Sequence, residues 1–367
     1  MKNLWTCIVL LMMVQPAYQH EKKTNNKFPI PPVRNLFIIT TDGFRWQEVF
    51  NGADSLLIND EKYTPDTATI KMMFWASSTE ERRKKLMPFF WNVLAAKGEI
   101  YGNRQFQNKV NVDNAYSISY PGYNEIFTGN TDIAISSNAK NPDPNVSILE
   151  YLNNKESFKG KVVAFTSWDV FPFILTKNRS QLPMNAGYEH ISDSTLTSEQ
   201  KLINKVQDDV VNEKSSTRFD ELTFLTAKEY ISKHQPRVVF LGLGETDEFA
   251  HKGRYDLYLQ HASEVDRMIE ELWHYVQTTP GYKDNTTFII TTDHGRGSKT
   301  SKWTDHGTFI SGSSQTWLAI MGPGIDPLGE VKDKEQLYQV QIAQTIAGLL
   351  GEEFISRESV APTISLR

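Results

Sequence analysis

Six side chains of the types that bind metal ions follow, or lie close behind, short apolar runs of this sequence. They are three aspartates and three histidines, in chain order Asp42, Asp247, His251, Asp293, His294 and His306. In an open parallel sheet, ligands bind beyond the carboxyl ends of the strands, so we expect all six to meet at one edge. Mixed carboxylate and imidazole ligands suit zinc, and six of them imply a pair of metal sites.

Ser119 offers a hydroxyl nucleophile for a hydrolytic reaction. It lies in the segment 113–130, directly before Tyr120-Pro121-Gly122, and a helical pattern follows it. A hydroxyl at a helix N-terminus gains from the positive end of the helix dipole, and an adjacent metal ion could deprotonate it. The alternative is that Ser117 or Ser119 simply caps that helix.

The elements that must position these residues can be read from the hydrophobic pattern. Apolar runs rich in β-branched and aromatic residues predict strands that are buried on both faces. These runs are 36–41, 162–166, 238–243, 287–292 and 317–321. Apolar residues at helical spacing predict helices over 258–276 and 335–350, and Gly351 is a natural end for the second. The alternation predicts one α/β domain with a central, mostly parallel sheet flanked by helices.

The composition of the 367 residues is that of a globular protein, with 39% hydrophobic and 23% charged residues. Lys+Arg 39 and Asp+Glu 44 give a net charge of −5. This excludes collagen-like and wholly disordered chains, and it gives no reason to expect a nucleic acid polymer as partner.

The N-terminus has the pattern of a secretory signal. We expect a signal peptide over 1–19, a Pro-rich linker over 20–33 and the folded domain over 34–367. The apolar run is about 11 residues long, too short for a membrane span, although an uncleaved anchor is the alternative. Cys7, the single cysteine, lies within that run. We therefore expect an exported protein, periplasmic or secreted, without disulfides or a membrane span after cleavage.

In combination, the motifs resemble those of the alkaline phosphatase superfamily, most closely its type I phosphodiesterase/nucleotide pyrophosphatase branch. The matching segments are Asp42-Gly43-Phe44-Arg45, Ser119-Tyr120-Pro121 with Thr128-Gly129, Asp247-x-x-x-His251, Asp293-His294-Gly295 and His306-Gly307. The resemblance extends over residues 35 to 325 and implies an alkaline-phosphatase-like fold.

The resemblance also implies two bound Zn²⁺ ions, with other divalent metals possible. One ion would be held by Asp247, His251 and His306. The other would be held by Asp42, Asp293 and His294 and would bind the alkoxide of Ser119. Ser119 would attack phosphorus in line to form a phosphoseryl enzyme, which water activated at the first zinc would hydrolyse.

Two further residues are expected to contact the phosphoryl group. An asparagine after the nucleophile does so in the family, and Asn138 matches best by position, with Asn124 and Asn141 as rivals. Monoesters carry additional charge that needs cations, for which Arg45 is a candidate beside Lys177 and Arg179. The sequence leaves the preference for monoesters or diesters open.

Departures from the family pattern leave more than one function open. Ser119 replaces the branch's usual threonine, which keeps the hydroxyl, and Gly122-Tyr123 replaces the usual Asn-His. Tyr123 also stands where the sulfatase motif has arginine. The leading hypothesis is a hydrolase of small-molecule phosphate esters. The alternatives are a sulfatase or phosphonate hydrolase on the same site, or a catalytically silent binding protein.

Overall fold

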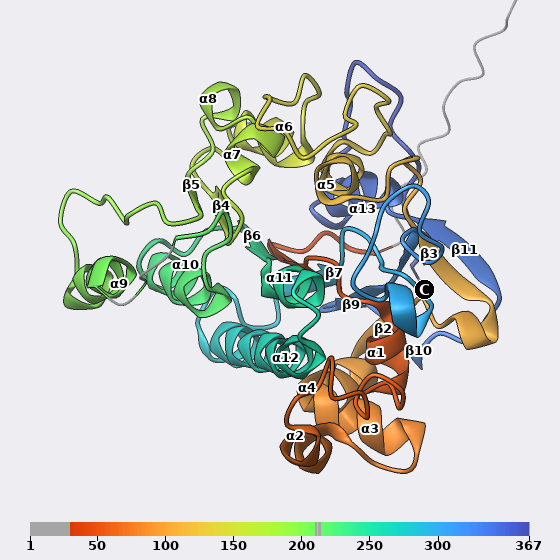
Figure 1. Cartoon of the computed structure of the whole chain (residues 1–367). Helices are drawn as coiled ribbons and strands as arrows, with labels where there is room; N and C mark the ends of the chain where they lie inside the picture. The colour runs from red at the N-terminus through yellow and green to blue at the C-terminus, as the bar shows by residue number, and fades with distance from the viewer. Residues whose placement is uncertain (1–29, 210, 212–213, 367) are drawn as a thin grey trace, which may run out of the picture.

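The computed structural model describes residues 30–209, 211 and 214–366. An eight-stranded sheet forms its centre, in the order β10-β2-β9-β7-β1-β6-β4-β5 (Figure 1). In that order, the strands are β10 (Gly329–Glu330), β2 (Gly98–Tyr101), β9 (Leu318–Met321), β7 (Thr286–Thr291), β1 (Asn35–Thr41), β6 (Val238–Leu243), β4 (Val162–Thr166) and β5 (Met184–Ala186). A smaller sheet has the order β11 (Glu335–Tyr338), β3 (Asn108–Asn111) and β8 (Gln315–Thr316).

Strand β1 lies between β7 and β6, and it pairs in parallel with both. Ile39 is the partner of Leu241 in β6 and of Ile290 in β7, so the carboxyl ends of the three strands are level. In the large sheet, β9 runs antiparallel to β7 and β2, and the other pairings are parallel. The predicted mostly parallel sheet is confirmed.

Helices cover both faces of the large sheet. The α-helices are α1 (Trp46–Asn51), α2 (Thr67–Phe74), α3 (Thr79–Leu86), α4 (Pro88–Asn92), α5 (Ser119–Thr128), α6 (Ile148–Asn153), α7 (Phe171–Ile174), α8 (Lys177–Ser180), α9 (Ser198–Asp209), α10 (Asp220–His234), α11 (Glu245–His251), α12 (Tyr255–Thr278) and α13 (Gln341–Leu349). Three short 3₁₀ turns are η1 (Leu94–Ala96), η2 (Arg104–Phe106) and η3 (Thr300–Lys302).

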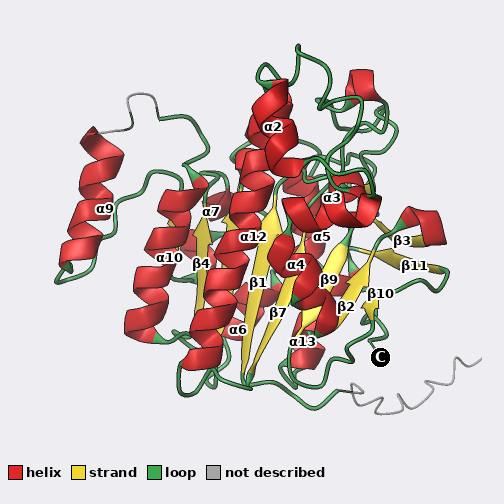
Figure 2. Ribbon diagram, turned by 90° about the horizontal axis from the view of Figure 1, so that it is seen from below, coloured by secondary structure: helices red, strands yellow, loops and turns green. Residues whose placement is uncertain are grey.

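Two hydrophobic cores lie on the two faces of the sheet because successive strand residues point to opposite sides. Phe37 and Ile39 of β1 point into the core that α4, α10 and α12 cover. Leu36 and Ile38 point into the core that α5, α6 and α13 cover. Figures 1 and 2 show these helices as separate layers on either side of the sheet. Buried strands between two helical layers account for the continuous apolar runs of the sequence.

The structure confirms one of the two predicted helices and corrects the other. Helix α12 extends from Tyr255 to Thr278 and contains the whole predicted segment 258–276. The segment 335–350 is divided, because its first residues form β11 and helix α13 begins only at Gln341. Leu337 pairs with Val110 of β3 and is buried between exposed neighbours, which is the alternation of a strand rather than a helix.

The described part of the chain begins inside the predicted linker 20–33. Ile30 and Val33 are buried, and the amide of Val33 donates to the carbonyl of Leu349 at 2.7 Å. The predicted signal peptide 1–19 lies outside the described residues. Among the helices that the structure describes, none is both long and apolar enough to cross a membrane.

Candidate metal centre

The six expected ligands lie at the carboxyl ends of three neighbouring strands and in one loop beyond them. Asp42 follows β1, and Asp293 with His294 follows β7. Helix α11 follows β6 and carries Asp247 and His251. Because β1, β6 and β7 are parallel and adjacent, Asp42 meets residues that lie 205 or more positions later in the chain. His306 reaches the same edge from the loop after η3.

Four of the groups form a buried set that we call the inner cluster: Asp42, Ser119, Asp293 and His294. His294 Nε2 lies 3.4 Å from Asp42 Oδ1, 3.5 Å from Asp293 Oδ2 and 3.3 Å from Ser119 Oγ. Ser119 Oγ is also 3.4 Å from Asp42 Oδ1. The ligand atoms of Asp42, Asp293 and His294 lie within 4.8 Å of one another, which is close enough for them to share one cation.

The other three ligands form the outer cluster: Asp247, His251 and His306. His251 Nε2 lies 3.1 Å from Asp247 Oδ2 and 3.0 Å from His306 Nε2. His306 Nε2 lies 3.8 Å from Asp247 Oδ1. The rings of His294 and His306 are stacked with centroids 4.0 Å apart, so the two clusters adjoin. Ligand atoms of Asp247, His294 and His306 also lie within 4.8 Å of one another, so His294 is close to both clusters. The division of the six ligands between two ions stays a prediction.

Hydrogen bonds orient two of the imidazoles for ligation. His294 Nδ1 lies 2.9 Å from the carbonyl oxygen of Gly295, and His306 Nδ1 lies 3.4 Å from that of Ser117. A carbonyl can only accept, so Nδ1 carries the proton in both rings and Nε2 keeps a free lone pair. Ser117 has a left-handed φ of 49°, which turns the chain immediately before α5. Both Nε2 atoms face the cluster to which their ring belongs.

The inner cluster places two carboxyl groups in a buried environment. Burial, followed by the nearby charge of Asp247, raises the pKa of Asp42 well above its ordinary value. Burial and the charge of Asp42 raise the pKa of Asp293 in the same way. Oδ1 of Asp293 accepts the amide of Gly43 at 3.0 Å, but Oδ2 is buried and has no hydrogen-bond partner. A buried carboxylate oxygen without a partner is costly unless a metal ion binds it.

The outer cluster has a different charge balance. Burial alone would raise the pKa of Asp247, but the Arg296 guanidinium and the two imidazoles hold it well below its ordinary value. Burial, and then the neighbouring His294, lower the pKa of His306 to about 2. His306 is therefore neutral, which is the form of imidazole that binds a metal.

Arg296 belongs to this site, and the sequence analysis did not identify it. Its guanidinium is fully buried and forms an ion pair with Asp247. Arg296 also donates from Nε to the carbonyl of Trp303 at 3.0 Å. The available signal was its position two residues after His294, within the same strand-end loop.

Arg45 lies away from the position that we expected. Its guanidinium is buried and paired with Glu48, to which Nε donates at 2.9 Å. The hydroxyl of Tyr255 donates to the same carboxylate at 3.0 Å. The positive charge of Arg45, which we expected to face a phosphoryl group, is instead neutralised by Glu48. We therefore no longer give Arg45 a catalytic role.

The structure distinguishes between the three candidate asparagines. Asn138 Oδ1 accepts the amide of Tyr120 at 2.9 Å, so its side chain lies at the first turn of α5 beside Ser119. Asn141 instead offers its backbone carbonyl to the Tyr120 hydroxyl at 2.6 Å. Asn124 is buried within α5 and points toward Asn130 at the far end of the helix. Of the three, Asn138 is the one that lies beside Ser119.

A third acidic cluster with a histidine lies nearby, formed by Asp220, Glu245 and His261. Its central carboxylate already has polar partners. Asp220 accepts hydrogen bonds from the Ser167 hydroxyl and from the amides of Gly244 and Glu245. These contacts fix the start of α11, so we interpret the cluster as structural.

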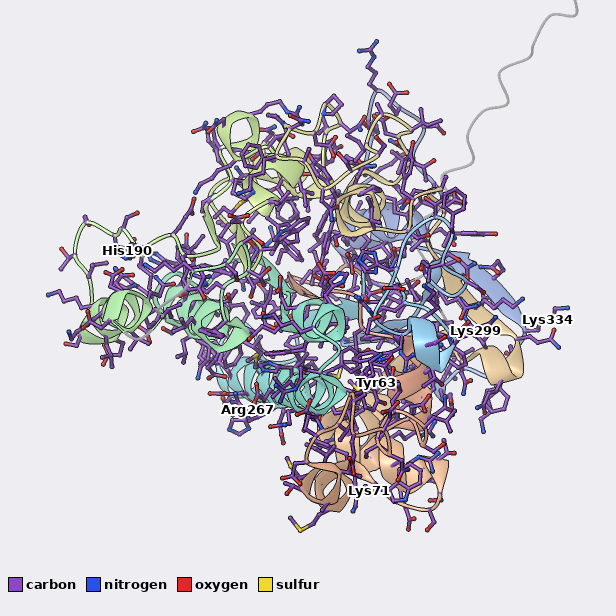
Figure 3. All side chains as sticks on the ribbon, in the orientation of Figure 1. Tyr63, Lys71, His190, Arg267, Lys299 and Lys334 are labelled. Carbon is purple, nitrogen blue, oxygen red and sulfur yellow. The ribbon has the colours of Figure 1, made fainter. Side chains whose placement is uncertain are left out.

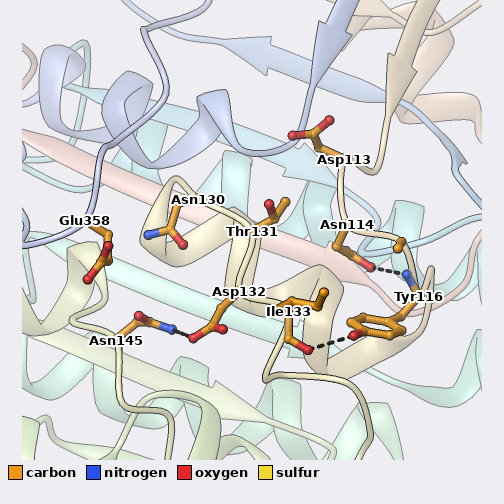
Figure 4. A pocket seen from close by; sticks show the side chains of 10 residues that line it. Asp113, Asn114, Tyr116, Asn130, Thr131, Asp132, Ile133, Asn145 and Glu358 are labelled. Atoms are coloured by element: carbon orange, nitrogen blue, oxygen red, sulfur yellow. Dashed lines mark hydrogen bonds between the residues drawn. The ribbon is translucent and has the colours of Figure 1, made fainter.

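Two other features lie outside the centre. His190 lies beside α9, at the left of Figure 3, where its Nε2 is 3.0 Å from Asp208 Oδ1. A cavity of about 570 Å³ lies next to the segment before Ser119 (Figure 4). Its lining consists of residues 113–116, 130–133, Asn145 and Glu358, and includes none of the expected ligands.

Comparisons with known proteins agree with this architecture. The sequence model of the Metalloenzyme superfamily matches residues 187–351, which contain five of the six expected ligands. No curated protein sequence matches the chain.

Solved structures share the fold at low sequence identity. The alkaline phosphatase PafA superposes with a TM-score of 0.61 at 12% identity, over 92% of this chain and 99% of that one. A putative sulfatase from Bacteroides thetaiotaomicron gives a TM-score of 0.56 at 12% identity, over 90% of this chain and 74% of that one. BT1596, a 2-O GAG sulfatase, gives 0.55 at 12% identity, over 90% and 73%. These structures confirm the expected alkaline-phosphatase-like fold, while the branch stays a prediction.

Proposed function

We propose that this chain, which has the alkaline-phosphatase-like fold, is an exported two-metal hydrolase that cleaves phosphate esters through a covalent intermediate on Ser119. One observation carries the proposal. The Ser119 hydroxyl lies 3.3 Å from His294 Nε2 and 3.4 Å from Asp42 Oδ1, among the ligand atoms of the inner cluster. A role as a helix cap would not explain why Ser119 faces a carboxylate that follows β1 and an imidazole that follows β7.

The residues fit a pair of divalent cations. The unpartnered Oδ2 of Asp293 and the raised pKa values of Asp42 and Asp293 call for positive charge in the inner cluster. The inner cluster would hold one ion and the outer cluster the other, and their carboxylate and imidazole donors favour zinc. When bound, such ions supply Lewis acidity and lower the pKa of a coordinated hydroxyl or water.

Ser119 supplies the nucleophile. The hydroxyl donates to Asp42 Oδ1 at 3.4 Å. Asp42 Oδ1 accepts the hydroxyl proton as Oγ attacks phosphorus and forms the new Oγ–P bond. The bond to the leaving alkoxide breaks on the opposite side, and the alkoxide takes a proton from water. Ser119 is the first residue of α5, so the positive end of a ten-residue helix lies behind the developing negative charge. Water then cleaves the phosphoseryl bond and restores the hydroxyl.

Asn138 orients the phosphoryl group. Its Oδ1 is bound to the Tyr120 amide, and this contact fixes the side chain and directs its NH₂ group away from α5. Hydrogen bonds from that NH₂ group to a phosphoryl oxygen strengthen as negative charge develops in the transition state.

We further propose that diesters are the preferred substrates. The extra charge of a monoester needs cations, but the three candidates are already paired. Arg45 binds Glu48, Lys177 binds Glu189 at 2.8 Å, and Arg179 binds Glu150 at 2.8 Å. A diester carries a single negative charge and does not need them.

The test compares three substrates on the zinc-loaded chain without residues 1–19: bis-p-nitrophenyl phosphate, p-nitrophenyl phosphate and p-nitrophenyl sulfate. We expect the diester to have the highest kcat/KM. A faster monoester would contradict the diester preference but keep the phosphohydrolase. A higher kcat/KM for the sulfate ester would indicate a sulfatase instead of a phosphohydrolase. Zinc binding without turnover of any of the three esters would indicate a binding protein.

Export is a separate part of the proposal and has a separate test. The chain is expressed with its own N-terminus in a bacterial host, and the periplasmic fraction is analysed by N-terminal sequencing. A new N-terminus near residue 20 supports cleavage of 1–19. A chain found intact in the membrane fraction would indicate an uncleaved anchor.

A further inference from the structure

We infer that Arg296 makes the two metal sites unequal: its guanidinium is a permanent cation of the outer cluster, so the inner cluster binds its metal ion first and more tightly. The inference rests on the proposed two-metal centre, and it concerns the order in which that centre fills. Its evidence is the position of Arg296, the charge of each cluster and the protons of the three imidazoles.

Arg296 is held in place by acceptors on three sides. Nη1 donates to Asp247 Oδ1, Nε donates to the carbonyl of Trp303 at 3.0 Å, and Nη2 donates to the carbonyl of Thr304. The guanidinium is fully buried. Because Arg296 has three acceptors and is completely buried, its guanidinium stays beside Asp247 when a metal ion binds.

The two clusters therefore present different charges to a cation. The inner cluster contains two carboxylates, and among the described residues no lysine or arginine forms an ion pair with Asp42 or Asp293. The outer cluster contains one carboxylate, Asp247, whose charge Arg296 already balances. A dication entering the outer cluster meets a buried positive charge, and such repulsion is strong where water is excluded.

Arg296 also occupies a donor atom that the outer metal would need. It binds Oδ1 of Asp247, the oxygen that faces His306 Nε2 at 3.8 Å. A metal ion between Asp247 and His306 has to share that oxygen with the guanidinium. No arginine contacts the corresponding oxygens of the inner cluster in the described structure.

The histidine protons show the same asymmetry. His294 and His306 each face a carbonyl oxygen with Nδ1, which leaves Nε2 free for a metal. His251 instead faces Arg296 Nη2 with Nδ1, at 3.4 Å. A guanidinium can only donate, so Nδ1 of His251 accepts, and the ring proton lies on Nε2, where it donates to Asp247 Oδ2 at 3.1 Å. Nε2 of His251 therefore faces the outer cluster with an N–H group, whereas Nε2 of His294 faces the inner cluster with a lone pair.

The experiment is a zinc titration of the chelator-treated chain, in competition with a chromophoric chelator of known affinity. We expect two steps whose dissociation constants differ by about tenfold or more, the size of effect that groups contacting metal ligands usually have. His294→Ala should remove the tight step, and His251→Ala should remove the weak one. Arg296→Gln should lower the dissociation constant of the weak step by about tenfold. Arg296→Lys keeps the positive charge and should preserve the difference between the two dissociation constants.

Arg104→Gln is the matched control, because Arg104 is a partly buried arginine that donates to Val110 and Asn111 in β3. It should leave both steps unchanged. Two steps of equal affinity in the wild-type chain would overturn the inference. So would an Arg296→Gln variant whose second step is unchanged or weaker, since Arg296 would then only orient Asp247.

If Arg296→Gln does not fold, the wild-type titration and the two histidine variants can still overturn the inference. Hydrolysis is measured on the same samples. Two unequal zinc steps without turnover would leave this inference intact and remove the proposed hydrolase. Turnover with two equal zinc steps would overturn this inference and leave the proposed hydrolase intact.

Discussion

The Ser119 hydroxyl and the His294 imidazole, 175 positions apart in the sequence, lie with Oγ 3.3 Å from Nε2. His294 presents a free lone pair there because the carbonyl of Gly295 holds its Nδ1 proton. Both groups can therefore bind the same cation. This relationship supports the proposed nucleophile over a helix cap, and the first prediction tests it.

We expect Ser119→Ala to lower kcat by about 10³-fold or more, because the oxygen that attacks phosphorus is removed. The fold should persist, with a thermal midpoint within about 2 °C of the wild type, since alanine fits the space of serine. Steady-state kinetics on the preferred ester and a thermal melt check both statements. Ser117→Ala is the control and should retain most of the activity. Loss of activity in Ser117→Ala alone would transfer the nucleophile to Ser117.

Asn138 gives a prediction that separates its two hydrogen bonds. Asn138→Asp keeps the acceptor for the Tyr120 amide but loses the NH₂ donor and adds negative charge beside the phosphoryl group. We expect it to lower kcat/KM more than Asn138→Ala, which should cost about 10- to 100-fold. If Asn138→Asp is the more active of the two, Asn138 serves to position α5 and does not contact substrate.

Asp293 gives a prediction about stability with and without zinc. Asp293→Asn removes a buried carboxylate whose pKa is raised by burial and by the charge of Asp42. The metal-free variant should melt a few degrees above the metal-free wild type, because a buried repulsion is relieved. Added zinc should stabilise the variant far less than the wild type. Differential scanning fluorimetry with and without zinc measures both, and equal zinc stabilisation would remove Asp293 from the ligands.

Glu125 gives a prediction about pH dependence. It is buried in α5, where its carboxyl group accepts the amides of Asp113 and Asn114, and burial raises its pKa from 4.5 to about 8. Because the folded pKa is above the unfolded one, the folded chain retains the proton, and the associated stability is lost as pH rises from about 4.5 to about 8.

Glu125→Gln imitates the protonated form at every pH. We expect it to raise the melting temperature of the metal-free chain clearly at pH 9 and little at pH 5, as measured by thermal melts across that range. Glu80→Gln is the control on an exposed helix face, where Glu80 pairs with Lys84. An equal gain at pH 5 and pH 9 would show that Glu125 does not titrate in this window.

Much of the fold followed from hydrophobic pattern. The run 36–41 is apolar throughout because β1 is buried on both faces, between two helical layers. A long amphipathic pattern such as 258–276 leaves no alternative to a helix. The helix predicted over 335–350 was wrong at its start because four of its residues pair with β3, a strand more than 200 positions away. Local periodicity does not record such a partner.

The sequence by itself determined which residue types could form a metal centre and, through the strand ends, that they would meet at one edge. Parallel adjacent strands leave their last residues level, so order and position along the chain were enough. Only the tertiary structure decided how charge is distributed there. It paired Arg45 with Glu48 and placed Arg296 on Asp247. The reason is physical: which opposite charges meet depends on how loops and helices pack, and the spacing of residues along the chain does not contain that information.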